Sequence, residues 1–241
     1  MASHFARWMM THVSVPARHL PDPVINFAHS LPEKRRARYL ASRALLAELM
    51  LRVYGISVLP ELTSGKNGRP CFADPELPDF SIAYAGNIVG VLLADEESYG
   101  GLGMEFVRAH SRQTIEQLAS GLSSGEKAWI RAQNEPYEAA TQLWTIRQSV
   151  LKLPDEANHG VHTLRLLPAS GRLRSLAFPD AQAISDEEDL MVWSCAFSHG
   201  SDRLHLWDYD GTVLARRYEM LTTSQHVGPR VLRLTSLPLE K

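Results

Sequence analysis

One uninterrupted helical segment constrains the fold of this chain more than any other feature. Residues 31–54 read LPEKRRARYLASRALLAELMLRVY and contain no glycine. The apolar residues that recur with the i, i+3, i+4, i+7 spacing of one helix face are Leu46, Leu49, Met50 and Val53. Gly55 follows as a stop signal. The segment therefore predicts a long helix with one buried face.

Runs typical of strands alternate with helical segments along the rest of the chain. FSIAYAGNIVGVLLAD (80–95) predicts two strands around a tight turn at residues 85–87. TSGKNGRP (63–70) reads as a loop, and residues 112–152 predict helices in two or three pieces. Strand patterns return after Pro154, in HTLRLLP, LMVWSCAFS and RLHLWDYDG. The last twenty residues predict a poorly ordered or strand-like tail.

The order helix, strands, helices, strands predicts an α+β fold of two lobes. The lobes are expected to meet near residues 99–101, which gives an N-terminal lobe of residues 1–99 and a C-terminal lobe of residues 100–241. Each lobe is expected to be a small antiparallel sheet covered by a long helix. The two halves would then form a pseudo-dimer, although no repeat is visible by sequence identity.

Composition excludes several classes of function. Among 241 residues, 22% are charged and the net charge is −2, so no basic surplus predicts nucleic-acid binding. No apolar run reaches the 18 or so residues that a membrane span requires. The two cysteines, Cys71 and Cys195, lack the CxxC spacing of a metal site. These features predict a cytoplasmic protein with reduced thiols.

The segment GLGMEFVR (101–108) raises a question of chemistry. It suits a short buried strand, yet it carries one acid, Glu105. Side chains two apart on a strand face the same way, so Gly103 and Glu105 share a face. The segment thus holds one carboxylate and leaves the matching position beside it without a side chain.

Five segments, in chain order, resemble motifs of the Sfp-type 4′-phosphopantetheinyl transferases. They are RRARYLASRALLAEL, GRPCF (68–72), SIAYAG (81–86), GLGMEFVR and WTIRQSVLK (144–152). The resemblance covers the first 150 residues well and the remainder poorly. The wording LLAELM, YAGN and SVLKL resembles that of one enterobacterial member.

The resemblance implies a reaction, a cofactor and a partner. Members of the family move the phosphopantetheine arm of coenzyme A onto a serine of an acyl or peptidyl carrier protein, release 3′,5′-ADP and need Mg²⁺. Mg²⁺ prefers hard oxygen ligands, which the family supplies from an Asp and a Glu of a strand and a Glu of a helix. Because both halves lie in one chain, a monomer is expected.

At the positions that match the family's metal ligands, this chain carries fewer carboxylates than the family pattern. With Gly101 as the motif's glycine, the family's Asp falls on Gly103 and its Glu on Glu105. A register shifted by two puts the Asp on Glu105 and the Glu on Val107, so one strand carboxylate is missing in either register. Arg108 favours the first.

The helix signature continues this loss of carboxylates. Gln148 replaces the helix Glu and Arg147 the first lysine, whereas Lys152 is kept. Glu105 and Gln148 are thus the expected metal ligands. Together with Lys152, they are also the expected catalytic residues. Gln148 can offer an oxygen to a metal but cannot accept a proton as a base. Restoring Gly103→Asp with Gln148→Glu would, on this interpretation, raise transfer.

The coenzyme A side keeps more of its positive charge. The resemblance and the basic run KRRAR assign coenzyme A binding to Arg35, Arg43, Arg69, Tyr84 and Lys152. Arginine suits phosphate through its planar fork of donors. Tyr84 stands where the family has histidine and could donate one hydrogen bond.

Three functions stay open on the sequence. The first is a phosphopantetheinyl transferase whose thin metal site recruits acids from residues 95–97 or Glu126. The second is a pseudoenzyme that binds coenzyme A or a carrier protein without efficient transfer. The third is an α+β protein with another role and no coenzyme A site.

Overall fold

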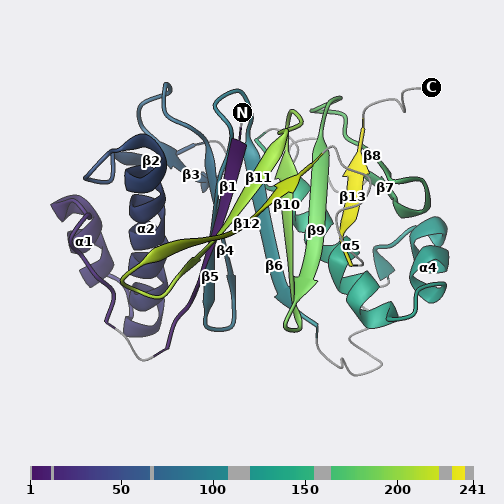
Figure 1. The fold of residues 1–241 in the computed structure, drawn as a ribbon, viewed down its shortest axis with the longest axis horizontal. Coiled ribbons are helices and arrows are strands. Elements are labelled where there is room, and N and C mark those ends of the chain that lie inside the picture. The colour runs from purple at the N-terminus through teal and green to yellow at the C-terminus, as the bar shows by residue number, and fades with distance from the viewer. Residues whose placement is uncertain are drawn as a thin grey trace. The chain divides into compact units, whose positions relative to one another are not determined.

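The computed structural model describes residues 2–11, 14–65, 68–107, 120–154, 164–222 and 230–236. Its internal contacts divide the chain into two compact units. The first comprises Met1–Tyr99 with Ser201–Thr223, and the second Gly100–Gly200 with Ser224–Lys241. Figure 1 labels the elements of both units.

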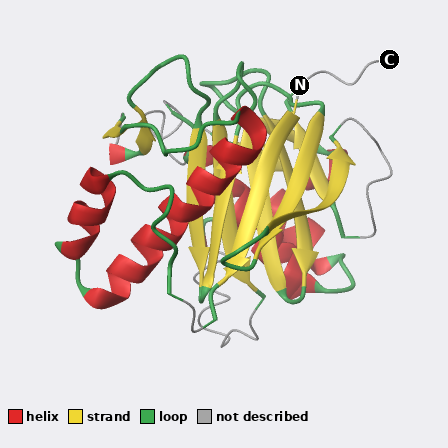
Figure 2. Cartoon of the chain, turned by 60° about the vertical axis from the view of Figure 1, so that its left-hand side comes forward, coloured by secondary structure: helices red, strands yellow, loops and turns green. Residues whose placement is uncertain are grey.

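The first unit is a five-stranded sheet with a helical layer. Its strand order is β12-β11-β1-β5-β4. The strands are β1 (Ala2–Met9), β4 (Phe80–Ala85), β5 (Ile88–Leu93), β11 (Arg203–Tyr209) and β12 (Leu214–Leu221). Helix α2 (Glu33–Tyr54) packs on β5 and β1, and α1 (Asp22–His29) packs on α2 (Figure 2). Strands β2 (Leu62–Ser64) and β3 (Pro70–Phe72) form a separate hairpin.

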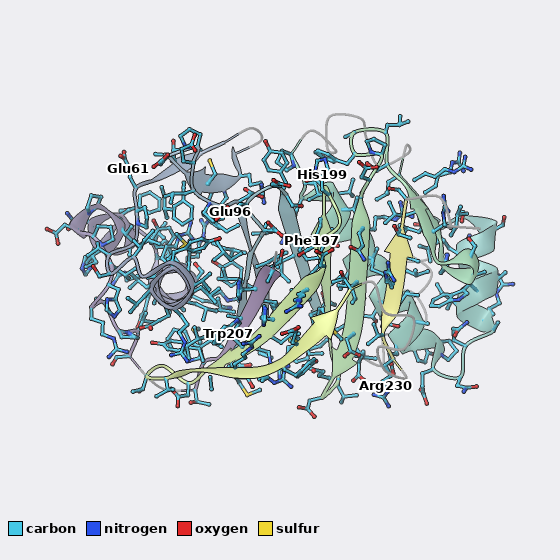
Figure 3. All side chains as sticks on the ribbon, turned by 45° about the horizontal axis from the view of Figure 1, so that its top comes forward. Glu61, Glu96, Phe197, His199, Trp207 and Arg230 are labelled. Carbon is cyan, nitrogen blue, oxygen red and sulfur yellow. The ribbon has the colours of Figure 1, made fainter. Side chains whose placement is uncertain are left out.

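Helix α2 confirms the long helix predicted from residues 31–54. It follows Pro32 and ends at Tyr54, where Gly55 adopts a left-handed φ of 69° and its N–H donates to the carbonyl of Leu51. Its buried face, which includes Leu45 and Leu49, joins a core with apolar side chains of the sheet. Figure 3 shows these side chains around α2, with Trp207 of β11 labelled.

The second unit is a six-stranded sheet covered by a helix. Its strand order is β6-β10-β9-β13-β8-β7. The strands are β6 (Gly100–Phe106), β7 (Arg165–Leu167), β8 (Arg172–Arg174), β9 (Gln182–Glu188), β10 (Met191–Phe197) and β13 (Leu232–Thr235), with the short 3₁₀ helix η2 (Pro168–Ser170) between β7 and β8. Helix α5 (Pro136–Leu151) packs on β6, β10 and β9, and α4 (Ser124–Arg131) packs on α5. The predicted stripe of Leu143, Ile146, Val150 and Leu153 is buried against this sheet.

The α+β class is confirmed, but the predicted lobes need two corrections. Residues 201–223, assigned to the C-terminal lobe, belong to the first unit because β11 pairs with β1. Moreover, neither sheet is purely antiparallel, since β1–β11 and β13–β8 are parallel. Parallel strands need long connections, so the sequence contains no hairpin signal that would predict these pairings. Similarity between the two halves stays a prediction.

Smaller elements also differ from the sequence pattern. The predicted loop at residues 63–70 starts and ends in the β2–β3 hairpin, and β13 lies within the predicted tail. Strands β1, β8, β9 and β12 and helix α1 were not predicted. No helix in the described part of the chain is long and apolar enough to cross a membrane.

Candidate functional site

A cationic cluster lies in the first unit, where the N-terminal half of α2 meets the end of β4. The Tyr84 hydroxyl is 3.1 Å from Ser42 Oγ, and Arg43 Nη1 donates to the same oxygen at 2.9 Å. The Arg43 guanidinium lies 4.0 Å from the centroid of the Tyr39 ring. Two predicted coenzyme A ligands, Arg43 and Tyr84, are thus brought together through the buried Ser42.

Arg38 completes this cluster, although the motifs did not single it out. Its Nη2 donates to the carbonyl of Gly86 at 2.7 Å, and its guanidinium carbon lies 5.7 Å from the Tyr84 ring centroid. Gly86 adopts a φ of 57° in the two-residue turn between β4 and β5, as the sequence predicted for this turn. The spacing of Arg38 and Ser42, four residues apart on α2, was the sequence signal that could have found it.

Arg69 and Arg35, the other two predicted coenzyme A ligands of this unit, are not part of this cluster. Arg69 donates from Nη1 and Nη2 to the two carboxylate oxygens of Asp79, at 2.9 and 2.8 Å, and also to the carbonyl of Phe80. Both partners of this ion pair are largely buried, so Arg69 has a full structural role. Arg35 is exposed on the first turn of α2.

In the second unit, the glycines of β6 allow an unusually close approach of helix α5. A Cβ atom added to Gly103 would lie 2.6 Å from the carbonyl oxygen of Thr145. One added to Gly101 would overlap the carbonyl of Ser149. The face of β6 on which the family pattern expects an Asp is therefore filled by helix backbone. This packing answers the question raised by GLGMEFVR.

Hydrogen bonds of two hydroxyl groups and of Lys152 stabilise this contact between β6 and α5. Thr145 Oγ1 lies 2.6 Å from Oγ of Ser194, the residue opposite Gly103 on β10, and both residues are fully buried. Lys152 Nζ donates to the carbonyl of Leu102 at 2.5 Å, which ties the end of α5 to β6. Lys152 thus keeps a structural role beside any role toward phosphate.

The predicted metal ligands lie on different elements of the second unit, Glu105 on β6 and Gln148 on α5. Glu105 lies three residues beyond Leu102 on β6, roughly 10 Å farther along the strand. Gln148 lies one turn before Lys152 on α5, near the opposite end of this contact. The described residues contain no group of three or more His, Cys, Asp or Glu that could hold a metal ion. Together with the filled space at Gly103, this donor set does not fit a three-carboxylate Mg²⁺ site.

Among the acids proposed to compensate, Glu126 has other partners. Glu126 is 1% exposed, forms a capping box with Ser123, and accepts a hydrogen bond from Arg147 Nη2 at 2.6 Å. This pair turns Arg147, the counterpart of the family's first lysine, toward α4. Asp95 is buried in the first unit. Arg108, used to choose the register, lies outside the described residues.

Comparisons with known proteins identify relatives of this chain. No family model matches the chain. Uncharacterized protein YieE of Escherichia coli is 44% identical over 216 residues, 88% of this chain and 86% of that protein. The 4′-phosphopantetheinyl transferase AcpT of Salmonella typhimurium is 30% identical over 142 residues, 58% of this chain and 68% of that protein. AcpT of Escherichia coli is 34% identical over 122 residues, 49% of this chain and 57% of that protein. The chain therefore belongs to the family that joins YieE to the AcpT 4′-phosphopantetheinyl transferases.

Proposed function

We propose that this protein is a 4′-phosphopantetheinyl transferase that moves the phosphopantetheine arm of coenzyme A onto a serine of an acyl or peptidyl carrier protein. The observation that carries the proposal is the cationic cluster of Arg38, Arg43, Ser42 and Tyr84, in a chain related to AcpT. It supplies fixed guanidinium groups of the kind that hold phosphates. Under this proposal the protein acts as a monomer.

Each unit would contribute a separate part of the task. Arg43 of the first unit would hold the nucleotide. Lys152 of the second, whose ammonium group donates to the carbonyl of Leu102, would face the pyrophosphate. In the reaction, the serine hydroxyl gives its proton to water, its oxygen forms a bond to the β-phosphorus of coenzyme A, the pyrophosphate P–O bond breaks, and 3′,5′-ADP leaves.

The residues present do not fit the Mg²⁺ that the family uses. Gly103 has no room for a carboxylate and Gln148 is neutral. Under the proposal, Glu105 and Gln148 at most hold water or the incoming serine. We therefore expect transfer to be slow compared with members that keep three carboxylates.

The close contact at Gly103 favours one second candidate. A chain that keeps the cationic cluster and lacks the metal ligands would bind coenzyme A or a carrier protein without efficient transfer. This pseudoenzyme would use the same surfaces, and only turnover separates it from the transferase.

One experiment distinguishes the two candidates. The protein is incubated with coenzyme A and several apo carrier proteins, and intact masses are recorded alongside a control transferase. A carrier that gains one phosphopantetheine supports the transferase. No gain on any carrier that the control modifies, with coenzyme A binding seen by calorimetry, supports the pseudoenzyme. Absence of both transfer and binding would overturn the proposal.

A further inference from the structure

A pocket of about 360 Å³ lies in the second unit, between α4, α5 and β7, which are labelled in Figure 1. Residues 120–123 before α4, Arg147 of α5 and residues 164–167 line three of its sides. Arg147 and Lys152 are five positions apart on α5, so their side chains leave the helix about 140° apart. The pocket is thus on a different side of α5 from the contact of Lys152 with Leu102.

The charged wall of this pocket is a buried ion pair. Arg147 is 9% exposed and Glu126 is 1% exposed. Arg147 donates from Nη2 to Glu126 Oε1 at 2.6 Å, and from Nη1 to the carbonyl of Leu164 at 3.3 Å. The second carboxylate oxygen of Glu126 accepts from the backbone N–H of Ser123 at 3.2 Å. Both oxygens of Glu126 are therefore engaged within the protein.

The guanidinium of Arg147 keeps one donor without an acceptor. Its Nε is buried and has no hydrogen-bond partner among the residues that the structure describes. A buried donor without an acceptor is costly, so an oxygen atom that entered the pocket beside Arg147 would be favoured. A carboxylate oxygen would be favoured more than a neutral one, because charge-assisted hydrogen bonds are the stronger kind.

The charges around the pocket also favour an anion. Two arginines and one glutamate line it. Arg147 and Glu126 compensate each other, and Arg165, an exposed residue of β7, adds a positive charge. The pocket also adjoins the N-terminus of α4, which carries the positive end of the helix dipole.

The remaining walls are apolar and leave room for a hydrocarbon chain. They are formed by Leu122, Leu164, Leu166 and Leu167. Leu167 is 41% exposed, so an apolar ligand would shield it from water. A Cβ atom added to Gly121 would meet no heavy atom within 4 Å. An inorganic anion would leave these leucines uncovered, whereas an anion with an aliphatic chain would cover them.

We propose that this pocket binds a small aliphatic carboxylate. Its carboxylate group would lie against Arg147 and the first turn of α4, and its chain would lie along the leucines. A pocket of this volume is at the lower end of the range for small-molecule sites, about 300–1,000 Å³. Such binding goes beyond the proposed function and does not depend on transfer.

The test titrates the full-length chain with butyrate, hexanoate and decanoate and follows binding by two-dimensional NMR. From butyrate to hexanoate, the affinity is expected to rise about 3- to 4-fold for each added methylene group, because each is buried. It should stop rising once the chain is longer than the pocket. Hexanamide has the same chain but no charge, and it should bind about 5- to 10-fold more weakly than hexanoate.

Three variants locate the binding. Gly121→Leu fills the pocket and is expected to weaken hexanoate binding by a factor of about 10 or more, with little change in melting temperature, because its Cβ meets no neighbour. Arg165→Gln is expected to weaken binding about 2- to 4-fold. Arg131→Gln is its matched control, because it removes an exposed arginine at the other end of α4, about 12 Å along the helix from Ser123, and should leave the affinity unchanged.

The results either support this carboxylate site or overturn it. Hexanoate binding that Gly121→Leu removes and Arg131→Gln leaves unchanged supports it. The site is overturned if hexanoate shows no saturable binding at millimolar concentrations, if hexanamide binds as tightly as hexanoate, or if Gly121→Leu binds hexanoate like the wild type. None of these results bears on transfer from coenzyme A, which is measured separately by the mass of the carrier protein.

Discussion

The contact between Gly103 and helix α5 makes a strong prediction about stability. A methyl group at position 103 would stand 2.6 Å from Thr145 O and 3.3 Å from Thr145 C, whereas ordinary contacts begin near 3.4 Å. The obstacle is helix backbone, which cannot rotate away as a side chain can. Gly101, two residues earlier, has an even closer contact with α5, so the helix is restrained along two turns.

The magnitude follows from two opposing terms. Overpacking in a well-packed core costs about 1–3 kcal/mol. Replacing glycine by alanine in a strand returns about 0.5–1 kcal/mol, because the unfolded chain loses freedom. Gly103→Ala should therefore lower the free energy of unfolding by about 1–2 kcal/mol. In a chain of this size, that corresponds to a fall in melting temperature of about 2–8 °C.

Chemical denaturation and thermal melting of two alanine variants test this reasoning. Gly121→Ala is the matched control, because no heavy atom lies within 4 Å of its added Cβ. It should leave stability unchanged or raise it slightly. If Gly103→Ala proves as stable as Gly121→Ala, the close packing of β6 and α5 is not real.

The same geometry corrects the sequence-based expectation for restoring the acid. Gly103→Asp adds a carboxylate to the steric conflict, on the face of the strand that the backbone of Thr145 fills. It should destabilise the protein more than Gly103→Ala does. The double variant Gly103→Asp with Gln148→Glu should therefore fail to gain transfer, and should not bind Mn²⁺ in a spectroscopic titration. A folded double variant that binds Mn²⁺ would refute this view.

Three further predictions concern buried charges. Burial is the largest cause that lowers the pKa of His4 to about 4. The stability that neutral His4 contributes is therefore complete above the unfolded pKa of about 6.5 and is lost as pH falls toward 4. Urea titrations should show a loss of about 2–3 kcal/mol in the free energy of unfolding over this range, and His4→Gln should lack it. Burial is likewise the largest cause that raises the pKa of Asp186, to about 6, so Asp186→Asn should stabilise the protein by about 1–2 kcal/mol at pH 8, a gain that vanishes near pH 4. Arg147→Met leaves Glu126 buried without its partner and should cost about 3–5 kcal/mol, most of which Glu126→Leu in the same chain should restore.

Local patterns predicted the elements whose neighbours are close in sequence. The stripe of α2, the turn at Gly86 and the apolar run of β10 each carry their own signal, so the α+β class followed from them. The pairing of β1 with β11 did not, because its partners are about two hundred residues apart and parallel. Membership of Ser201–Thr223 in the first unit was invisible for the same reason.

For the candidate site, the sequence predicted residue types better than their partners. Arg43 and Tyr84 were expected near one another, and they are joined. Arg69 was expected to bind phosphate, yet Asp79, ten residues later, forms an ion pair with it. A motif records which charge is present. It does not record which hydrogen-bond donors are already paired within the protein, because that depends on the three-dimensional structure.

The two parts of the candidate site differ because they respond differently to substitution. In the cationic cluster, charge is carried by the long side chains of Arg38 and Arg43, which are held by contacts with Tyr84, Tyr39 and Ser42. At β6, the space beside Gly103 is filled by the backbone of Thr145 in helix α5, as expected for a close-packed interior. An acid could therefore occupy position 103 only together with a second substitution that moves the helix away from the strand.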